Sequence, residues 1–364
     1  MAAAAGTGHA AMTGETVHEL REATAAEIAD WDALVAQNPD GGQFTQTLAF
    51  AEVKRWDGFR THHMVYDGDE PVRALVLERH GVVGRFWYVP SGPWHPRLDS
   101  IVAATRAYVE RHRRDLVSVK LEPRLRRTDE HMALLRDAGL VEADDVQIHT
   151  HTVIADLAQG PDALFASFSK AARKNIRHAE REGYTVERVE PTPALMDQMW
   201  ARMQTISGGR GLAGMRGEEY YRTVWKAFTD HGMADWWVGE DGGDGPQTIT
   251  FTIPFGRDVI DKDEGSRPDR RINGGAHLGR WTRMRHYAER GFEGFDMMGA
   301  PPSWRKDDET HFMHSLARFK TQFAPIADFV PSFDLELKPG RQRLWDRYVR
   351  PIEWRAKRRY TGLW

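Results

Sequence analysis

The first half of the chain carries an ordered succession of helical and strand patterns. Apolar residues three and four apart predict helices, and period-two alternation predicts strands. The order is helix, helix, strand, strand, helix, strand, at residues 25–37, 47–56, 61–66, 72–78, 100–113 and 116–121. The first two strands flank Asp67-Gly-Asp-Glu-Pro71, whose residue types favour a tight turn. These two strands are therefore predicted to form a hairpin.

The second half repeats this order. Its elements lie at residues 193–207, 218–230, 234–239, 248–253, 277–290 and 294–298. Matching elements are roughly 170 residues apart, which is too long for a solenoid repeat and typical of a duplicated domain. Helix, helix, hairpin, helix, strand is the order of one N-acetyltransferase-like unit. We therefore predict an α/β (α+β) fold of two tandem acetyltransferase-like domains, each a mixed sheet flanked by helices, although another α+β pair would give the same order.

The expected domain ranges follow from this duplication. Residues 1–16 are interpreted as a disordered tail, because they lack the basic region and apolar core of a signal peptide. The two domains are expected at 17–156 and 157–338. Residues 339–364 are expected to form a basic amphipathic helix that docks on the body, with contact to an anionic membrane surface as the alternative.

Composition narrows the classes of function. The chain has 364 residues, 41% of them hydrophobic, and a formal net charge of −3, so any cationic binding site must be local. It has no cysteine, which excludes disulfides, cysteine-ligated metals and thiol nucleophiles. No stretch approaches the roughly 20 apolar residues of a membrane-spanning helix. We expect a cytoplasmic protein that works as a monomer.

A cationic segment opens the second domain. At helical spacing its basic side chains share one side and its apolar side chains the other. The cations are Lys170, Arg173, Lys174, Arg177 and Arg181. Such runs are commonly solvated surface, but the first acidic residue after Ser169 is Glu180. A phosphate-rich partner is an equally good interpretation.

Two further segments are candidates for chemistry. Residues 208–221 form a glycine-rich run before a helix, which would suit either an anion or an exposed loop. Lys320 lies between Phe319 and Phe323, where a partly buried ammonium would be a fixed donor. By its chemistry alone an ordinary surface lysine is the better interpretation. The histidine pairs at 149 and 151 and at 311 and 314 lack a completing carboxylate, so we expect no metal site.

The order of motifs resembles that of the Fem peptidyltransferase family, which transfers amino acids from aminoacyl-tRNA to peptidoglycan precursors. Ser169–Gly183 is similar to the family's Lys-x-x-Arg-x-Asn-Ile-Arg helix, and Arg318-Phe319-Lys320 to its Phe-Lys pair. The other similar segments are Gln43–Lys54, Tyr88–Pro93, Lys120–Pro123, Arg216–Tyr221 and Phe295–Gly299. A family tyrosine after the second hairpin has no clear counterpart in Ile260–Ser266, and the long helical arm of some members is missing.

The resemblance implies a role for each group of residues. Phe319 and Lys320 would lie at the acyl-transfer centre, and the cations of 170–181 would face tRNA. The residues implied to contact the nucleotide-sugar or phosphate part of the precursor are Lys54, Arg216, Tyr220 and Tyr221. The implied partners are aminoacyl-tRNA, a lipid-linked or nucleotide-linked peptidoglycan precursor and, peripherally, the inner face of the membrane. No cofactor is expected.

The reaction implied is transfer of glycine, serine or alanine to a precursor amine. Because the ester is already activated, the protein need mainly position the reactants and stabilise the oxyanion. One rival is a coenzyme-A-dependent N-acyltransferase, disfavoured because we identify no Gln/Arg-x-x-Gly-x-Gly/Ala pyrophosphate loop. Others are tRNA-dependent acylation of a natural-product amine, and a basic module that only binds RNA or lipid.

Overall fold

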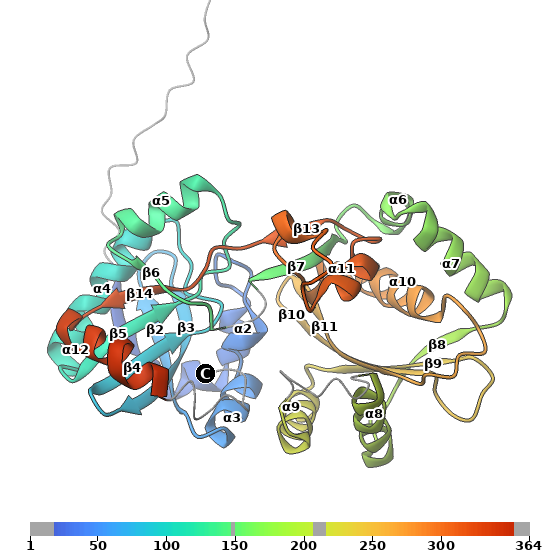
Figure 1. Cartoon of the computed structure of the whole chain (residues 1–364). Coiled ribbons are helices and arrows are strands. Elements are labelled where there is room, and N and C mark those ends of the chain that lie inside the picture. Colours follow the sequence, from blue (N-terminus) through green and yellow to red (C-terminus); the bar gives the residue numbers. More distant parts are fainter. Residues whose placement is uncertain (1–17, 147–149, 207–215, 353–364) are drawn as a thin grey trace, which may run out of the picture.

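The computed structural model has two lobes, each built on one mixed sheet (Figure 1). It describes residues 18–146, 150–206 and 216–352, so the expected tail at 1–16 lies outside the described residues, as do His149, most of the glycine-rich run and residues 353–364. Among the described residues, no helix has the length and apolarity to cross a membrane. The predicted fold class is confirmed.

The first sheet has seven strands in the order β1-β2-β3-β4-β5-β14-β6. Only β4 and β5 pair in parallel. The strands are β1 Glu19–Glu22, β2 Arg60–Asp67, β3 Val72–Gly81, β4 Gly84–Val89, β5 Leu116–Leu121, β6 Val141–Glu142 and β14 Phe333–Glu336. Its helices are α1 Ala25–Ala29, α2 Trp31–Val35, η1 Phe44–Gln46, α3 Leu48–Trp56, α4 Leu98–His112, α5 Asp129–Asp137, α12 Pro339–Leu344 and η3 Trp345–Val349.

The second sheet also has seven strands, in the order β13-β7-β12-β11-β10-β9-β8. Only β11 and β12 pair in parallel. The strands are β7 His151–Asp156, β8 Thr185–Val189, β9 Asp235–Glu240, β10 Thr248–Phe255, β11 Asp258–Ser266, β12 Gly294–Gly299 and β13 Ile326–Asp328. Its helices are α6 Pro161–Ser167, α7 Lys170–Arg181, α8 Pro193–Ile206, α9 Glu218–Asp230, α10 Gly275–Ala288, η2 Ser303–Arg305 and α11 His314–Lys320.

The predicted duplication is confirmed element by element. In the first lobe α3, β2, β3, β4, α4 and β5 follow one another, and α9, β9, β10, β11, α10 and β12 repeat that succession. In each copy the helix between the last two strands makes them parallel, as a crossover connection requires. The helix predicted at 25–37 is instead two short helices that meet at Asp30.

Two strands join a different sheet from the one that the expected domain ranges imply. Strand β7 lies before the expected boundary at 156, but it pairs with β12 and β13 of the second sheet. Strand β14 lies in the expected second domain, but it pairs with β5 and β6 of the first. The apolar patterns of these strands require burial in a sheet but do not specify which sheet. The sequence pattern therefore placed both strands in the wrong domain.

One apolar cluster joins the lobes. It contains Phe50 and Val53 of α3 together with Trp225 and Phe228 of α9. Helix α3 is capped by Thr47, whose hydroxyl accepts from the Phe50 N–H at 3.2 Å. Since α3 and α9 pack against each other, the residues at their ends meet between the two lobes.

Candidate functional site

A cluster of cations and tyrosines lies where α3 meets the start of α9. Arg216 donates to both carboxylate oxygens of Asp57, at 2.8 and 2.9 Å, and lies 4.5 Å from the centre of the Tyr220 ring. Lys54 is buried, with its Nζ 3.7 Å from the same carboxylate. The structure thus brings together the four predicted substrate-binding residues, Tyr221 packing beside Tyr220. These residues are far apart in sequence, and the contact between α3 and α9 brings them together.

A further cation in this cluster was missed by the sequence prediction. Lys262 of β11 lies 5.9 Å from the Tyr221 ring centre and 3.2 Å from Asp263 Oδ1. Although burial opposes its charge, Asp263 and the two tyrosines raise its pKa, so it stays an ammonium. It occupies the stretch in which a family tyrosine was expected. The sequence pattern for this strand was weak, because the charged residues after Ile260 interrupt the alternation of apolar and polar positions.

Protonation of the cluster follows from its burial. Burial, with Arg216 nearby, lowers the pKa of Lys54 to about 8, although Asp57 opposes the shift. Burial raises the pKa of Tyr221 to about 12, so this phenol remains a hydrogen-bond donor near neutral pH. The cluster therefore offers ammonium, guanidinium and phenol donors, which together suit a phosphate-bearing ligand.

Lys320 is buried at the end of α11, not on the surface as its chemistry alone suggested. Its Nζ donates to the carbonyls of Met298 and Gly299, at 2.7 and 2.8 Å. Burial, with the positive charge of Arg280, lowers its pKa to about 8. An ammonium has three N–H donors, so one remains beyond these two carbonyls.

The carbonyls that Lys320 holds belong to a distorted part of β12. Pairing between β12 and β7 shifts register between Asp296 and Gly299, and Met298 has φ 58°. A positive φ is costly for a side chain of this size and is maintained only by surrounding contacts. Here the contacts are Lys320 and the Asp296 carboxylate, which accepts from the Met298 N–H at 2.7 Å. The ammonium is thereby fixed at a preorganised bend.

An ion-pair network surrounds Lys320. Arg280 and Arg283 of α10 both contact Asp261 of β11, at 2.7 and 3.2 Å. These cations outweigh the effect of burial and lower the pKa of Asp261. Phe319 faces α10, with the Arg280 guanidinium 5.0 Å from its ring centre and His277 4.8 Å away. Phe319 and Lys320, adjacent in sequence, therefore both lie near Arg280.

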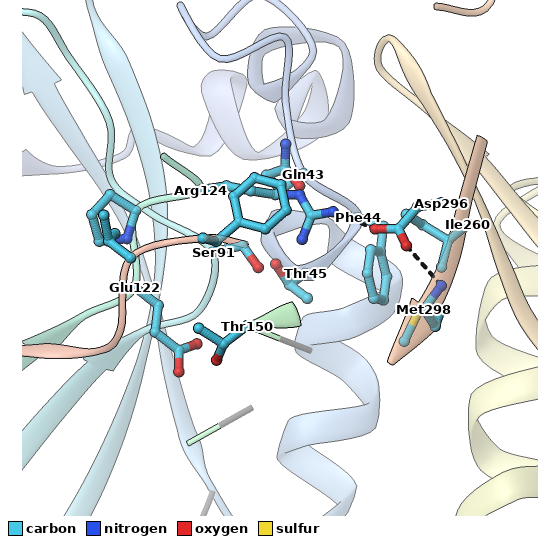
Figure 2. Close-up of a pocket in the computed structure, with 13 residues that line it drawn as sticks. Gln43, Phe44, Thr45, Ser91, Glu122, Arg124, Thr150, Ile260, Asp296 and Met298 are labelled. Carbon is cyan, nitrogen blue, oxygen red and sulfur yellow. Dashed lines mark hydrogen bonds and ion pairs between the residues drawn. The ribbon is translucent and has the colours of Figure 1, made fainter. Parts of the chain in front are cut away.

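A pocket between the lobes leads to this bend. Its walls come from η1, the end of β5, β11 and β12, and include Phe44, Thr45, Glu122, Ile260 and Met298. Figure 2 shows Arg124 of the first lobe reaching across to Asp296, with which it forms an ion pair. Met298 lines the pocket, and its carbonyl accepts from Lys320, so the lysine contacts a residue of the pocket wall. Sequence reasoning named Asp296 only as part of a motif and did not name Arg124.

The cations predicted for tRNA lie on α7, at the outer end of the second lobe (Figure 1). The helix begins at Ser169, whose hydroxyl accepts from the Ala172 N–H at 3.1 Å, and it buries Ala172, Ile176 and Ala179. Among the described residues, none of its five cations has a carboxylate within ion-pair distance; these are Lys170, Arg173, Lys174, Arg177 and Arg181. The helix thus presents the predicted cationic face.

One exclusion made from the sequence is wrong. Residues 271–276 read Arg-x-x-Gly-x-Ala, which fits the pyrophosphate-loop pattern, and they lie at the start of α10, directly after β11 and the loop that follows it. Gly274 has φ 88°, and a side chain there would meet the Asn175 carbonyl of α7. The run was overlooked because the expected helix began only at His277. Among the described residues, no group of three or more metal-binding side chains gathers anywhere.

Comparison with known proteins identifies this architecture. Residues 166–309 match the family model described as an acetyltransferase (GNAT) domain. A crystal structure of FemX superposes with a TM-score of 0.75 at 17% identity, covering 91% of this chain and 99% of that one. The chain has the fold of FemX. The resemblance carried by the Fem motifs is therefore confirmed at the level of the fold.

Two further solved structures superpose on the chain with lower TM-scores. L-PGS from Bacillus licheniformis has a TM-score of 0.51 at 17% identity, covering 96% of this chain and 99% of that one. The C-terminal domain of a putative lysylphosphatidylglycerol synthetase from Agrobacterium fabrum has a TM-score of 0.51 at 17% identity, covering 90% and 97%. No curated protein matches the chain. The FemX-like fold and the GNAT match support an acyltransferase.

Proposed function

We propose that this FemX-like protein is an aminoacyltransferase that moves glycine, serine or alanine from aminoacyl-tRNA to an amine of a peptidoglycan precursor. The observation that carries the proposal is the placement of Lys320. It is a buried ammonium fixed at a strand bend, where it donates to the carbonyl of Met298, a residue that lines the pocket between the lobes. A site of this kind suits stabilisation of an oxyanion in a reaction that needs no protein nucleophile.

The donor would reach Lys320 along the second lobe. The start of α7 adjoins the end of α11, since the Ser169 N–H donates to the Gln322 carbonyl at 2.8 Å. His277 lies between Asn175 and Gln322, at 3.4 and 3.3 Å. An RNA held by the α7 cations could therefore extend its acceptor end past α10 and Phe319 toward Lys320. We assign tRNA binding to the five α7 cations on this basis.

The acceptor would enter from the other side. The Lys54, Arg216 and Lys262 cations would hold its phosphates, with Tyr220 and Tyr221 as further donors. Strand β11 connects the two sites, because Lys262 faces the tyrosines while the neighbouring Asp261 belongs to the network around Lys320. A precursor bound at the cations can thus direct its peptide into the pocket.

The chemistry is aminolysis of an ester. The precursor amine attacks the ester carbonyl carbon, a C–N bond forms, and the C–O bond to the ribose breaks. The amine loses one proton and the ribose oxygen gains one, so the tRNA leaves as a free hydroxyl. The third N–H of Lys320 would donate to the oxyanion or to the leaving oxygen.

A coenzyme-A-dependent N-acyltransferase remains the rival, and the run at 271–276 removes the reason for which the sequence disfavoured it. Glycine-rich helix starts bind phosphate through backbone N–H groups. The same helix start would equally suit an RNA phosphate, so the pattern does not distinguish the two donors. A natural-product amine as acceptor is the second alternative. We propose that the protein acts in the cytoplasm, where charged tRNA is available, and that it acts as a monomer.

The test is transfer by the purified protein. Radiolabelled glycyl-, seryl- and alanyl-tRNA would be offered with lipid-linked and nucleotide-linked precursor, with and without ribonuclease, and with acetyl-coenzyme A in parallel. We expect label in the precursor from at least one charged tRNA and none after ribonuclease treatment. Transfer that survives ribonuclease and requires the thioester would establish the rival.

A further inference from the structure

The last described helix of the chain has two apolar faces. It runs without interruption through α12 and η3 to Ile352. One face docks: Trp345 is 8% exposed and its ring centre lies 4.6 Å from that of Phe86. The other carries Leu344, Tyr348 and Ile352, which are 52%, 56% and 65% exposed. Docking through Trp345 therefore leaves a second stripe uncovered among the described residues.

Cations accompany this stripe. Arg341, Arg343 and Arg347 are exposed, and within the described residues none of them has a carboxylate at ion-pair distance. Between Arg341 and Arg359 the sequence holds eight cations and two carboxylates, a net charge of +6 for a chain whose total is −3. The twelve residues after Ile352 add Trp354, Tyr360, Leu363 and Trp364. The end of the chain thus combines strong positive charge with aromatic and aliphatic side chains.

A neighbouring hairpin extends the exposed apolar surface. Arg341 Nη1 lies 3.5 Å from the Val83 carbonyl, which places the turn between β3 and β4 beside the helix. Val82 in this turn is 84% exposed. Two elements that are far apart in sequence therefore present apolar side chains next to arginines at the same end of the molecule.

We propose that this surface, formed by residues 341–352 and Val82, binds an anionic lipid membrane. Cationic helices with an exposed apolar stripe lie in the interface, the stripe among the acyl chains and the arginines at the head groups. Nucleic acid is a poorer partner here, because phosphates make no apolar contacts with Leu344 or Ile352. The α7 cations lie at the opposite end of the molecule (Figure 1).

The surface also has a defined relation to the precursor site. Phe86, which contacts Trp345, and Tyr88 are two residues apart on β4 and so point to the same face of the sheet. Tyr88 belongs to the cluster with Phe50 and Val53 of α3, the helix that carries Lys54. The continuous helix of α12 and η3 therefore covers the same face of the first sheet as α3, the helix that carries Lys54. Given the proposed function, this arrangement favours a lipid-linked acceptor.

The test is co-sedimentation with vesicles. We expect the full chain to bind phosphatidylglycerol-containing vesicles and to release them at high salt. It should not bind vesicles of pure phosphatidylcholine. Leu344→Ser with Ile352→Ser should weaken binding about tenfold or more. Arg343→Gln with Arg347→Gln should weaken it several-fold. Phe312→Ser, which removes an 81% exposed aromatic from the other lobe, is the matched control and should bind normally.

Other outcomes would overturn the proposal. These are no binding to anionic vesicles, equal binding to phosphatidylcholine, or undiminished binding of the Leu344 and Ile352 variant. A variant that changed only the oligomeric state would instead identify a contact between copies. Transfer to a soluble, nucleotide-linked acceptor should be unaffected by these substitutions. Loss of vesicle binding and failure of the transfer reaction are therefore separate results.

Discussion

At the scale of single residues, Lys320 combines a structural and a chemical role. Its ammonium satisfies two buried carbonyls on β12 and would leave one N–H for the reacting oxygen. Loss of a buried partner costs about 1–3 kcal/mol for each group left unpaired. A variant at this position can therefore lose activity for either reason, and the experiments must separate them.

Replacement of Lys320 by methionine separates the roles. We expect kcat to fall about 10²–10³-fold while precursor affinity stays within a few-fold, because the lost donor acts mainly on the developing oxyanion. Calorimetric titration and steady-state kinetics measure the two quantities. Leu135→Ala, in the core of the first lobe, is a control of comparable destabilisation, about 2–5 kcal/mol. Full turnover by Lys320→Met would exclude the chemical role.

The pH dependence of turnover is a second test at this scale. Burial and Arg280 lower the pKa of Lys320 to about 8, so the ammonium is present below that pH and is lost above it. We expect kcat to decline as pH rises through about 8. In Lys320→Arg the guanidinium stays protonated, so a slower enzyme without this decline is expected. An unchanged decline in the variant would assign it to another group.

At the scale of elements, α7 carries an exposed cationic face that internal contacts do not explain. Its apolar side packs into the second lobe, while its cations find no carboxylate partners among the described residues. An unpaired basic face on a nearly neutral chain concentrates positive potential at one place. Binding of an extended polyanion would use this potential, and it would do so with a strong dependence on salt.

Charge reversal on α7 tests this interpretation. We expect Lys170→Glu, Lys174→Glu and Arg181→Glu together to weaken tRNA binding strongly and to lower the slope of log affinity against log salt by about 2–3. Fluorescence anisotropy with labelled tRNA at several salt concentrations gives both values. Arg111→Glu, Arg114→Glu and Arg136→Glu together, which reverse three exposed cations of the first lobe, are the matched control. Equal loss in the control would indicate only a general effect of charge.

At the scale of the whole molecule, the return of the chain to the first sheet at β14 ties the lobes together. Strands β7 and β14 each lie between two others in their sheets, so removal of either would unpair two ladders. The Arg124–Asp296 and Arg216–Asp57 ion pairs add polar contacts across the same junction. The geometry of the pocket between the lobes is thereby fixed by the chain path.

Division of the chain tests this coupling. Residues 17–156 and 157–338, produced separately, should each lack a cooperative thermal transition, because each lacks a strand that is paired on both sides in its own sheet. A full-length chain cleaved at an engineered site near residue 158 keeps both strands and should retain its transition. Circular dichroism during heating measures both. Two fragments that each unfold cooperatively would show that β7 and β14 are dispensable for folding of their sheets.

The sequence by itself determined the local and repeated features of this protein. Alternation and helical spacing gave both hairpins, and β5 and α9 were placed at the residues the structure shows. These patterns are local, because an amphipathic helix or strand requires only that one of its faces be buried. The motifs around Arg216 and Lys320 were also readable, since their order resembles that of one family.

Tertiary structure alone decided which sheet β7 and β14 join and what surrounds the key side chains. Strand β11 was missed because its second half is charged, and with it Asp261 and Lys262 were missed. The Asp261 charge is tolerated because Arg280 and Arg283 of α10 neutralise it, while the adjacent Asp263 neutralises Lys262. For the same reason Lys320 read as a surface lysine: its carbonyl partners lie on a bent strand about twenty residues earlier, and only folding brings them to the ammonium.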